Sequence, residues 1–198
     1  MMSKTPIRYF LRSWTAPEDA WYALLDGAVI PQLPGLLQQY DLPCACLYAG
    51  ALAPDLAQVA PYLVRLDGHE DFLSFYDSCG WAPHWGVFFS APADLRQMRR
   101  HCRRFLMVMG PEQQPLYLRY YDPRVLPGFL ETCDRTQLKE FFGPITGFFI
   151  DQAPNGGILK LSLHEGRLLS AGSSALASVS PVATTGPSQF VEHDYAEA

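Results

Sequence analysis

Eight residues, RYYDPRVL (Arg119 to Leu126), bring together side-chain types that hold charged ligands. They contain two arginines, an aspartate and two tyrosines, and they follow the apolar alternation of PLYL. Arginine binds phosphate and carboxylate groups through paired N–H donors, and a neighbouring aspartate can accept a proton. One hypothesis is therefore a small α/β enzyme or a phosphorylated-ligand-binding protein that uses Arg119, Asp122 and Arg124.

The same stretch also has an architectural interpretation. Asp122-Pro123 is typical of the N-cap and first position of a helix, where a carboxylate accepts backbone N–H groups. The alternation in LYLRYY places Arg119 in the middle of a strand, in a sheet that we expect to be covered on both faces. A buried arginine needs a carboxylate partner, and Asp26 and Asp122 are the candidates. We favour this structural role for Asp26, Arg119, Asp122, Pro123 and Arg124.

A second concentration of charge lies in DLRQMRRHCRRFLMVM, Asp94 to Met109, for which the sequence predicts one long helix. Asp94 and Gln97 have the spacing of a capping box, and the apolar residues gather into one stripe that would face the sheet. The outer side of this helix would carry five arginines: Arg96, Arg99, Arg100, Arg103 and Arg104. They form either a solvated face with local ion pairs or a docking surface for an acidic partner.

Other patterns with chemical meaning are weak. Cys44 and Cys46 share one face of a predicted strand, but no second cysteine pair follows at the spacing of a zinc site. The five cysteines, an odd number, fit reduced and buried thiols. The sequence has no G-x-S-x-G nucleophile motif, no dinucleotide fingerprint and no phosphate loop. We therefore expect no catalytic residue, no metal site and no cofactor.

The bulk composition narrows the function classes further. The chain has 198 residues, is 48% hydrophobic and carries a formal net charge of -5. This acidic balance argues against nucleic acid or an anionic membrane as the main partner. No apolar run is long enough to span a bilayer, and the N-terminus lacks a signal-peptide pattern. We expect a cytoplasmic protein.

The elements that position these residues alternate between strands and helices. Strands are predicted at 21–26, 44–48, 61–66, 84–90 and 115–121, and helices at 5–14, 31–40, 69–79, 94–109, 127–133 and 135–142. A hairpin follows at 146–163. The order predicts an α/β domain at 1–169, with a mixed, largely parallel sheet and helices on both faces.

The C-terminal residues 170–198 have a different composition. No charged side chain occurs between Arg167 and Glu192, and serine, alanine, threonine, glycine and proline dominate this stretch. Such a segment buries too little apolar surface to offset its ordering entropy. We expect a flexible or partner-ordered tail, with Phe190, Val191 and Tyr195 as anchors on another surface.

Several motifs together resemble the DUF4123 family. They are YALLDGA, LYAG, APYLVRL, WGVFFSA with DLRQMRRHCRRFLMV, RYYDPRVL and QLKEFFGPI, in order between residues 21 and 151. The resemblance implies an adaptor chaperone of the bacterial type VI secretion system, which binds a toxic effector and helps to load it onto the VgrG spike. It implies no catalytic residue.

Overall fold

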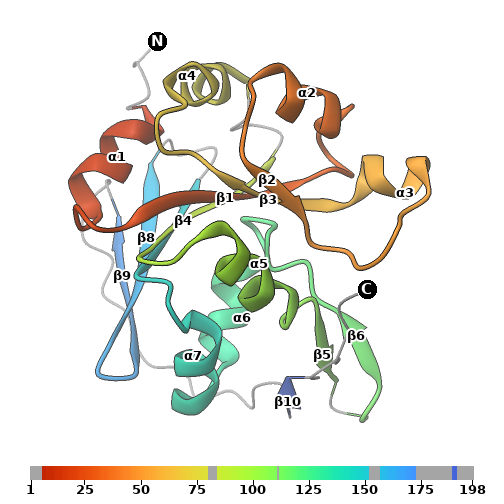
Figure 1. Ribbon diagram of the computed structural model, residues 1–198. Helices are drawn as coiled ribbons and strands as arrows, with labels where there is room; N and C mark the ends of the chain where they lie inside the picture. The colour runs from red at the N-terminus through yellow and green to blue at the C-terminus, as the bar shows by residue number, and fades with distance from the viewer. Residues whose placement is uncertain (1–5, 80–83, 111, 152–156, 173–188, 191–198) are drawn as a thin grey trace.

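The computed structural model describes residues 6–79, 84–110, 112–151, 157–172 and 189–190. Within these residues the chain forms an α/β fold of seven helices and ten strands (Figure 1). The helices are α1 (Ile7–Trp14), α2 (Leu33–Gln39), α3 (Pro54–Val59), α4 (Glu70–Cys79), α5 (Leu95–Arg103), α6 (Leu126–Thr132) and α7 (Arg135–Phe142). The strands are β1 (Ala20–Asp26), β2 (Cys44–Cys46), β3 (Pro61–Arg65), β4 (Gly86–Ala91), β5 (Met107–Met109), β6 (Pro115–Tyr117), β7 (Gly147–Asp151), β8 (Ile158–His164), β9 (Arg167–Gly172) and β10 (Gln189–Phe190).

The main sheet has the order β2-β3-β1-β4-β7-β8-β9, and all of its neighbouring strands are antiparallel. The expected mixed α/β class is confirmed, but the expectation of a largely parallel sheet is wrong. β1 and β2 run in the same direction, as do β3 and β4, yet in each pair a third strand lies between the two. The connections through α2, from β1 to β2, and through α4, from β3 to β4, therefore link strands of the same direction that are not neighbours, so neither connection creates a parallel pairing.

Helices cover both faces of this sheet, as expected. In Figure 1, α1, α2 and α4 lie above it, and α5, α6 and α7 lie below it. The alternation along β1 explains the two layers: Tyr22 and Leu24 belong to the lower core, whereas Ala23 and Leu25 belong to the upper one. A continuous apolar strand is thus buried on both faces without being parallel to its neighbours.

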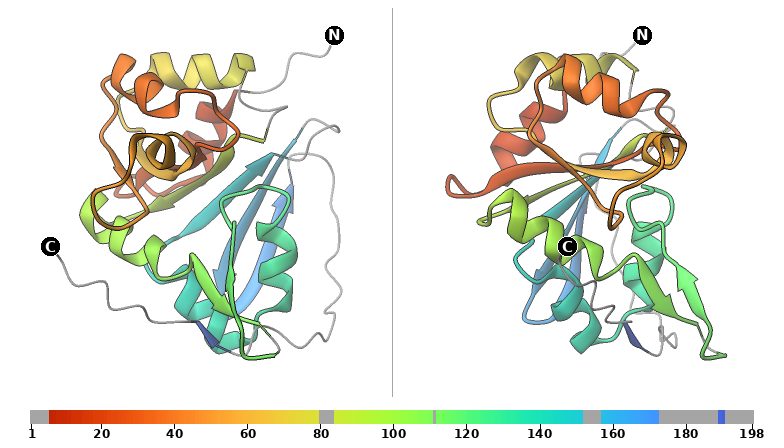
Figure 2. Two further views of the ribbon diagram at one scale, coloured as in Figure 1. Left: turned by 90° about the vertical axis from the view of Figure 1, so that its right-hand side faces the viewer. Right: turned by 45° about the vertical axis from the view of Figure 1, so that its right-hand side comes forward.

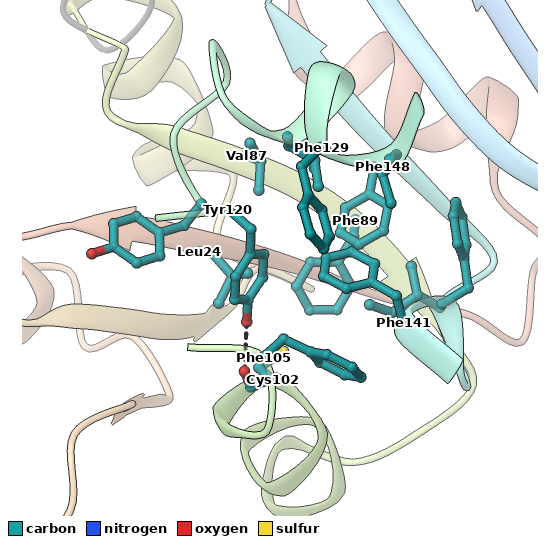
Figure 3. Packing of buried hydrophobic residues seen from close by; sticks show 14 of the residues in the cluster. Leu24, Val87, Phe89, Cys102, Phe105, Tyr120, Phe129, Phe141 and Phe148 are labelled. Atoms are coloured by element: carbon teal, nitrogen blue, oxygen red, sulfur yellow. Dashed lines mark hydrogen bonds between the residues drawn. The ribbon is translucent and has the colours of Figure 1, made fainter. Parts of the chain in front are cut away.

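The lower core is rich in aromatic side chains that come from distant parts of the chain (Figure 3). Phe141 of α7 lies within 6 Å of both Phe105 and Phe148, with ring centroids at 4.9 and 5.8 Å. Tyr120 is buried among them, and its hydroxyl donates a 2.7 Å hydrogen bond to the carbonyl oxygen of Cys102. This bond holds the segment after β6 against the end of α5.

Helix α5 is shorter than the sequence predicts. Its N-terminal capping box is confirmed, because the Asp94 carboxylate accepts from the Gln97 backbone and the Gln97 side chain accepts from the Asp94 backbone. The helix ends at Arg103, and a turn places Phe105 in the lower core. Met107–Met109 then form β5, in the centre of a separate three-stranded antiparallel sheet of β10, β5 and β6.

The C-terminal part of the chain is described only in places. β7 and β8 form the expected antiparallel pair, and β9 extends it to Gly172, beyond the expected domain boundary at residue 169. Gln189–Phe190 pair with β5. Val191 and Tyr195, like the residues of the connection 152–156, lie outside the described residues. In the described part of the chain, none of the helices has the length and apolar character needed to cross a membrane.

Candidate partner-binding surface

Arg119 forms an ion pair with Asp26, the last residue of β1. The expected position of Arg119 in mid-strand is wrong, because β6 ends at Tyr117 and Arg119 lies in the segment that follows. The expected partner is confirmed: Nη2 of Arg119 donates to Oδ2 of Asp26, while the Ala28 backbone N–H donates to Oδ1 at 3.0 Å. The aspartate side chain is only 2% exposed and the arginine side chain is 44% exposed. The hydrogen bond with Asp26 raises the pKa of Arg119.

Gly27, the residue after Asp26, allows the end of β1 to lie close to the end of α3. A Cβ atom on Gly27 would lie 2.4 Å from the carbonyl oxygen of Ala60 and 2.5 Å from that of Gln58. The Gly27 backbone N–H donates to the Ala60 carbonyl at 3.1 Å. A side chain at this position would therefore push β1 away from the end of α3, which explains the Asp26-Gly27 pair in structural terms.

Asp122 forms a second ion pair, with Arg124. Asp122 is not the N-cap of a helix, because α6 begins at Leu126 with Val125 as its N-cap. Its carboxylate instead accepts three hydrogen bonds from Arg124: from the backbone N at 2.9 Å, from Nε at 2.9 Å and from Nη2 at 2.6 Å. Burial would raise the pKa of Asp122, but these bonds lower it below its usual value. Pro123 lies inside the tight turn that these bonds close.

These contacts bear on the hypothesis of an enzyme or a phosphorylated-ligand site. Such a site needs the charged groups of Arg119, Asp122 and Arg124 to face a ligand. Arg119 and Arg124 instead each hold a nearly buried carboxylate of the same chain. The geometry therefore favours the architectural interpretation of this stretch.

Three tyrosines connect the Asp26–Arg119 pair to the surface. The Tyr117 hydroxyl donates to the Tyr48 hydroxyl at 3.1 Å and lies 3.4 Å from that of Tyr121. The Arg119 guanidinium lies 6.0 Å from the ring centroid of Tyr121. Burial raises the pKa of Tyr121 to about 12. The edge of this cluster reaches solvent, because Tyr117 is 42% exposed and the adjacent Leu116 is 43% exposed.

The sequence predicts all five arginines on the outer side of the helix, but in the structure they do not all lie there. Arg99 covers the edge of the main sheet: its Nε donates to the Cys46 carbonyl at 2.8 Å and its Nη2 to the Tyr48 carbonyl at 3.3 Å. The backbone of β3 forms hydrogen bonds with the backbone of Pro43 and Leu47. Because successive backbone groups of a strand alternate in direction, the carbonyls of Cys46 and Tyr48 point away from β3. Arg99 therefore satisfies backbone acceptors at the outer edge of β2.

Arg104 is likewise engaged within the chain. Its Nη2 lies 2.7 Å from Oε1 of Glu140 on α7, and its guanidinium lies 5.6 Å from the ring centroid of Phe105. Arg103 is half-buried, whereas Arg96 and Arg100 are exposed. Arg96 and Arg100 are thus the two of the five arginines with exposed side chains.

Exposed cationic and apolar side chains form one candidate surface. We define the arginine–tyrosine surface by the exposed Arg96, Arg100, Leu116 and Tyr117 together with the half-buried Tyr48. Arg99 connects its two parts, because it belongs to α5 and bonds to the backbone of Tyr48, whose hydroxyl meets Tyr117. No aspartate or glutamate occurs in Leu95–Arg104, so the helix itself supplies no carboxylate to offset its arginines. This combination suits an acidic partner segment that also presents apolar side chains.

Sequence reasoning missed the apolar half of this surface. Leu116 and Tyr117 were expected in a covered strand, but β6 belongs to the small sheet and all three of its residues are exposed. The only sequence signal for their exposure is the short run of polar residues before Pro115. Tyr48 was part of a predicted strand that in fact ends at Cys46.

The described residues hold no group of three or more histidine, cysteine, aspartate or glutamate side chains that could bind a metal ion. The five cysteines are free, but only Cys102 is buried, so the interpretation of all five as buried thiols is too broad. Burial raises the pKa of Cys102 to about 12 and also raises the pKa of the half-buried Cys46, which disfavours the thiolate form that a metal or an electrophile would need.

A family model described as "Domain of unknown function (DUF4123)" matches residues 21–140, more than half of the chain. The matched range contains both ion pairs, the whole of α5 and the tyrosine cluster. No curated protein and no solved structure matches the chain.

Proposed function

The chain belongs to the DUF4123 family, and from this premise we propose that it is an adaptor chaperone of a type VI secretion system. In this role it binds an effector protein in the cytoplasm and promotes loading of the effector onto the VgrG spike. The protein acts by binding and not as an enzyme, and neither nucleic acid nor a membrane is its partner.

The observation that carries this proposal is the arginine–tyrosine surface on a protein of net charge -5. Its exposed arginines, Arg96 and Arg100, lie on a helix without acidic residues, and Leu116 and Tyr117 add exposed apolar area nearby. Arginine and tyrosine are enriched at the energetic centres of protein interfaces. By contrast, the charged side chains that could serve a catalytic site are paired with one another.

A deletion of the gene in its host tests the function. We expect export of one effector to stop while the other cargo of the same secretion system continues to be exported, because an adaptor serves its own effector. Continued export of all cargo would contradict the role in loading. Loss of all cargo would instead indicate a general component of the secretion apparatus.

Complementation of this deletion tests the surface. A chain with Arg96→Glu and Arg100→Glu should restore export less well than the wild-type chain. A control variant carries two charge changes outside α5, Glu18→Gln and Asp71→Asn, at residues that are also exposed. Equal export with both variants would show that the proposed surface takes no part in the function.

A further inference from the structure

Strand β9 is the longest edge strand among the described residues. It forms one end of the seven-stranded sheet, where β8 is its one neighbour in the described part of the chain. The other edge strands, β2, β6 and β10, have three, three and two residues, whereas β9 has six. Arg99 covers the edge at β2 and β6 begins with Pro115, but β9 contains no proline and no lysine. Edges of this length are normally protected in such ways, so β9 is suited to pair with another strand.

The turn before β9 determines which of its backbone groups point outward. Glu165-Gly166 joins β8 to β9 in two residues with φ values of 49° and 74°. A turn of this kind is closed by a hydrogen-bonded pair, here His164 and Arg167, and the direction of the backbone groups then alternates along the strand. The N–H and C=O groups that point away from β8 therefore belong to Leu168, Ser170 and Gly172. They are spaced as an added strand requires.

The two faces of β9 carry different side chains. Leu168 packs against the lower core, on the side of α7. Arg167, Leu169 and Ala171 lie on the other face and are all exposed, Leu169 to 49%. In a strand added antiparallel to β9, three side chains would lie directly opposite these residues, as closely spaced pairs. Apolar side chains there would cover Leu169 and Ala171.

Positive charge gathers at the end of β9 that follows the turn. Nη2 of Arg135 donates to the Glu165 carbonyl oxygen at 2.8 Å, and a Cβ atom on Gly166 would lie 3.0 Å from Cε of Lys139. Figures 1 and 2 show α7, which carries both cations, beside this turn. Neither Lys139 nor Arg167 forms an ion pair with a residue in the described ranges. A carboxylate on the added strand would therefore be favoured at this end.

We propose that β9 binds an extended segment of a partner protein as an eighth, antiparallel strand of the main sheet. The segment presents apolar side chains opposite Ala171 and Leu169 and a carboxylate opposite Arg167. Because it runs antiparallel to β9, its sequence reads apolar-x-apolar-x-acidic. A second copy of β9 does not meet this requirement, because Arg167–Gly172 contains no carboxylate. The site is distinct from the arginine–tyrosine surface, which adjoins β2 at the other end of the sheet.

A blocked peptide, Thr-Val-Thr-Val-Thr-Glu, is the probe in an NMR titration of the full-length protein. In the proposed register its threonines lie opposite Gly172, Ser170 and Leu168. We expect the amide signals of these three residues to shift and their hydrogen exchange to slow on binding. N-methylation of the second threonine removes a donor to Ser170 and should weaken binding about tenfold. N-methylation of the second valine, whose N–H points to solvent, should weaken it much less. Equal losses, or no shift of β9 signals at millimolar peptide, would overturn the proposal.

The variant Arg167→Gln tests the charge at the turn. Replacement of the peptide's glutamate by glutamine should weaken binding to the wild-type chain several-fold at low salt, but should not weaken binding to this variant. The matched control Arg100→Gln removes an exposed arginine elsewhere and should behave as the wild type. Equal losses with wild type and Arg167→Gln would overturn the assigned register.

Hydrogen exchange of the free protein tests whether the edge is open. The amides of Leu168, Ser170 and Gly172 should exchange rapidly, because β8 does not bond to them. Slow exchange would overturn the proposal: dependence on protein concentration would assign the edge to a second copy, and independence would assign it to the same chain. None of these measurements involves an effector or VgrG, so they can fail while the adaptor function stands.

Discussion

The same residue type serves two purposes in two regions of this molecule. After β6, Arg119 and Arg124 each pair with a carboxylate that is almost inaccessible to solvent, Asp26 and Asp122. On α5, Arg96 and Arg100 are exposed on a helix without acidic residues. In the first region Arg119 holds distant parts of the chain together and Arg124 closes a local turn, whereas the second region presents charge to the outside.

The difference shows that the position of the carboxylate decides the role of the arginine. A nearly buried carboxylate without its guanidinium would remain charged in a poorly solvated place, which makes the pair necessary for stability. An exposed arginine stays solvated in the folded chain, and its replacement usually has a small effect on folding. Variants of the two regions should therefore separate stability from binding.

The largest expected effect on stability is that of Arg119→Met. The change leaves the Asp26 carboxylate without its guanidinium partner, and we expect a loss of about 2 kcal/mol in the free energy of unfolding, measured by urea denaturation. This figure is below the range for fully buried pairs because Arg119 is 44% exposed. In the double variant Asp26→Asn/Arg119→Met the two effects should not add. Additive losses would show that the pair does not act as a unit.

A pH-dependent effect should come from the side of α5 that faces the body of the protein. Nε2 of His101 lies 2.9 Å from the Phe141 carbonyl oxygen and donates to it, and burial lowers the pKa of His101. The unfolded chain then binds a proton more readily than the folded one. The contribution of neutral His101 to the free energy of unfolding is fully present above the ordinary histidine pKa of about 6.5. It decreases as the pH falls below that value.

Urea denaturation at about pH 7.5 and about pH 5 measures this dependence on either side of that pKa. His101→Gln retains a donor for the carbonyl but has no titrating group, so its stability should change less between the two pH values. An unchanged pH dependence in this variant would assign the effect to other groups.

A smaller effect is expected for Arg124→Met. The Arg124 side chain is 62% exposed, and the Arg124 backbone N–H still donates to Asp122 after the change. We expect a smaller loss in the free energy of unfolding at neutral pH than for Arg119→Met. Because the Asp122 pKa is lowered in the folded state, its contribution is present above the ordinary aspartate pKa of about 3.9 and is lost as the pH falls below that value. A loss as large as that of Arg119→Met would show that exposure does not separate the two pairs.

Part of this architecture could be predicted from the sequence. The pattern of apolar residues indicated most elements and the burial of β1 on both faces, and the need of a buried arginine for a carboxylate indicated Asp26 as one of two candidate partners of Arg119. The direction of the strands could not be predicted, because burial on both faces is common to parallel strands and to this interleaved antiparallel sheet. The end of α5 was missed because Phe105 and Leu106 continue the helical stripe while in fact they turn into the core.

The candidate surface was predicted only in part for a related reason. Five arginines at helical spacing indicate a cationic face, but their partners come from segments far away in the sequence: Cys46 for Arg99 and Glu140 for Arg104. Such contacts between distant segments are set by the tertiary fold, and the pattern of one helix does not contain them. Only the structure therefore reduces the five arginines to the exposed pair Arg96 and Arg100.

The rate of association with the effector tests the central claim most directly, because it separates the two sets of arginines. In the variant Arg96→Glu/Arg100→Glu we expect unchanged unfolding free energy and an association rate reduced about tenfold at low salt, with a smaller reduction at physiological salt. Arg119→Met should have the opposite profile, with lower stability and a nearly normal association rate under conditions where it is folded. An unchanged association rate in the α5 variant, or a loss of binding in a folded Arg119→Met chain, would contradict the account.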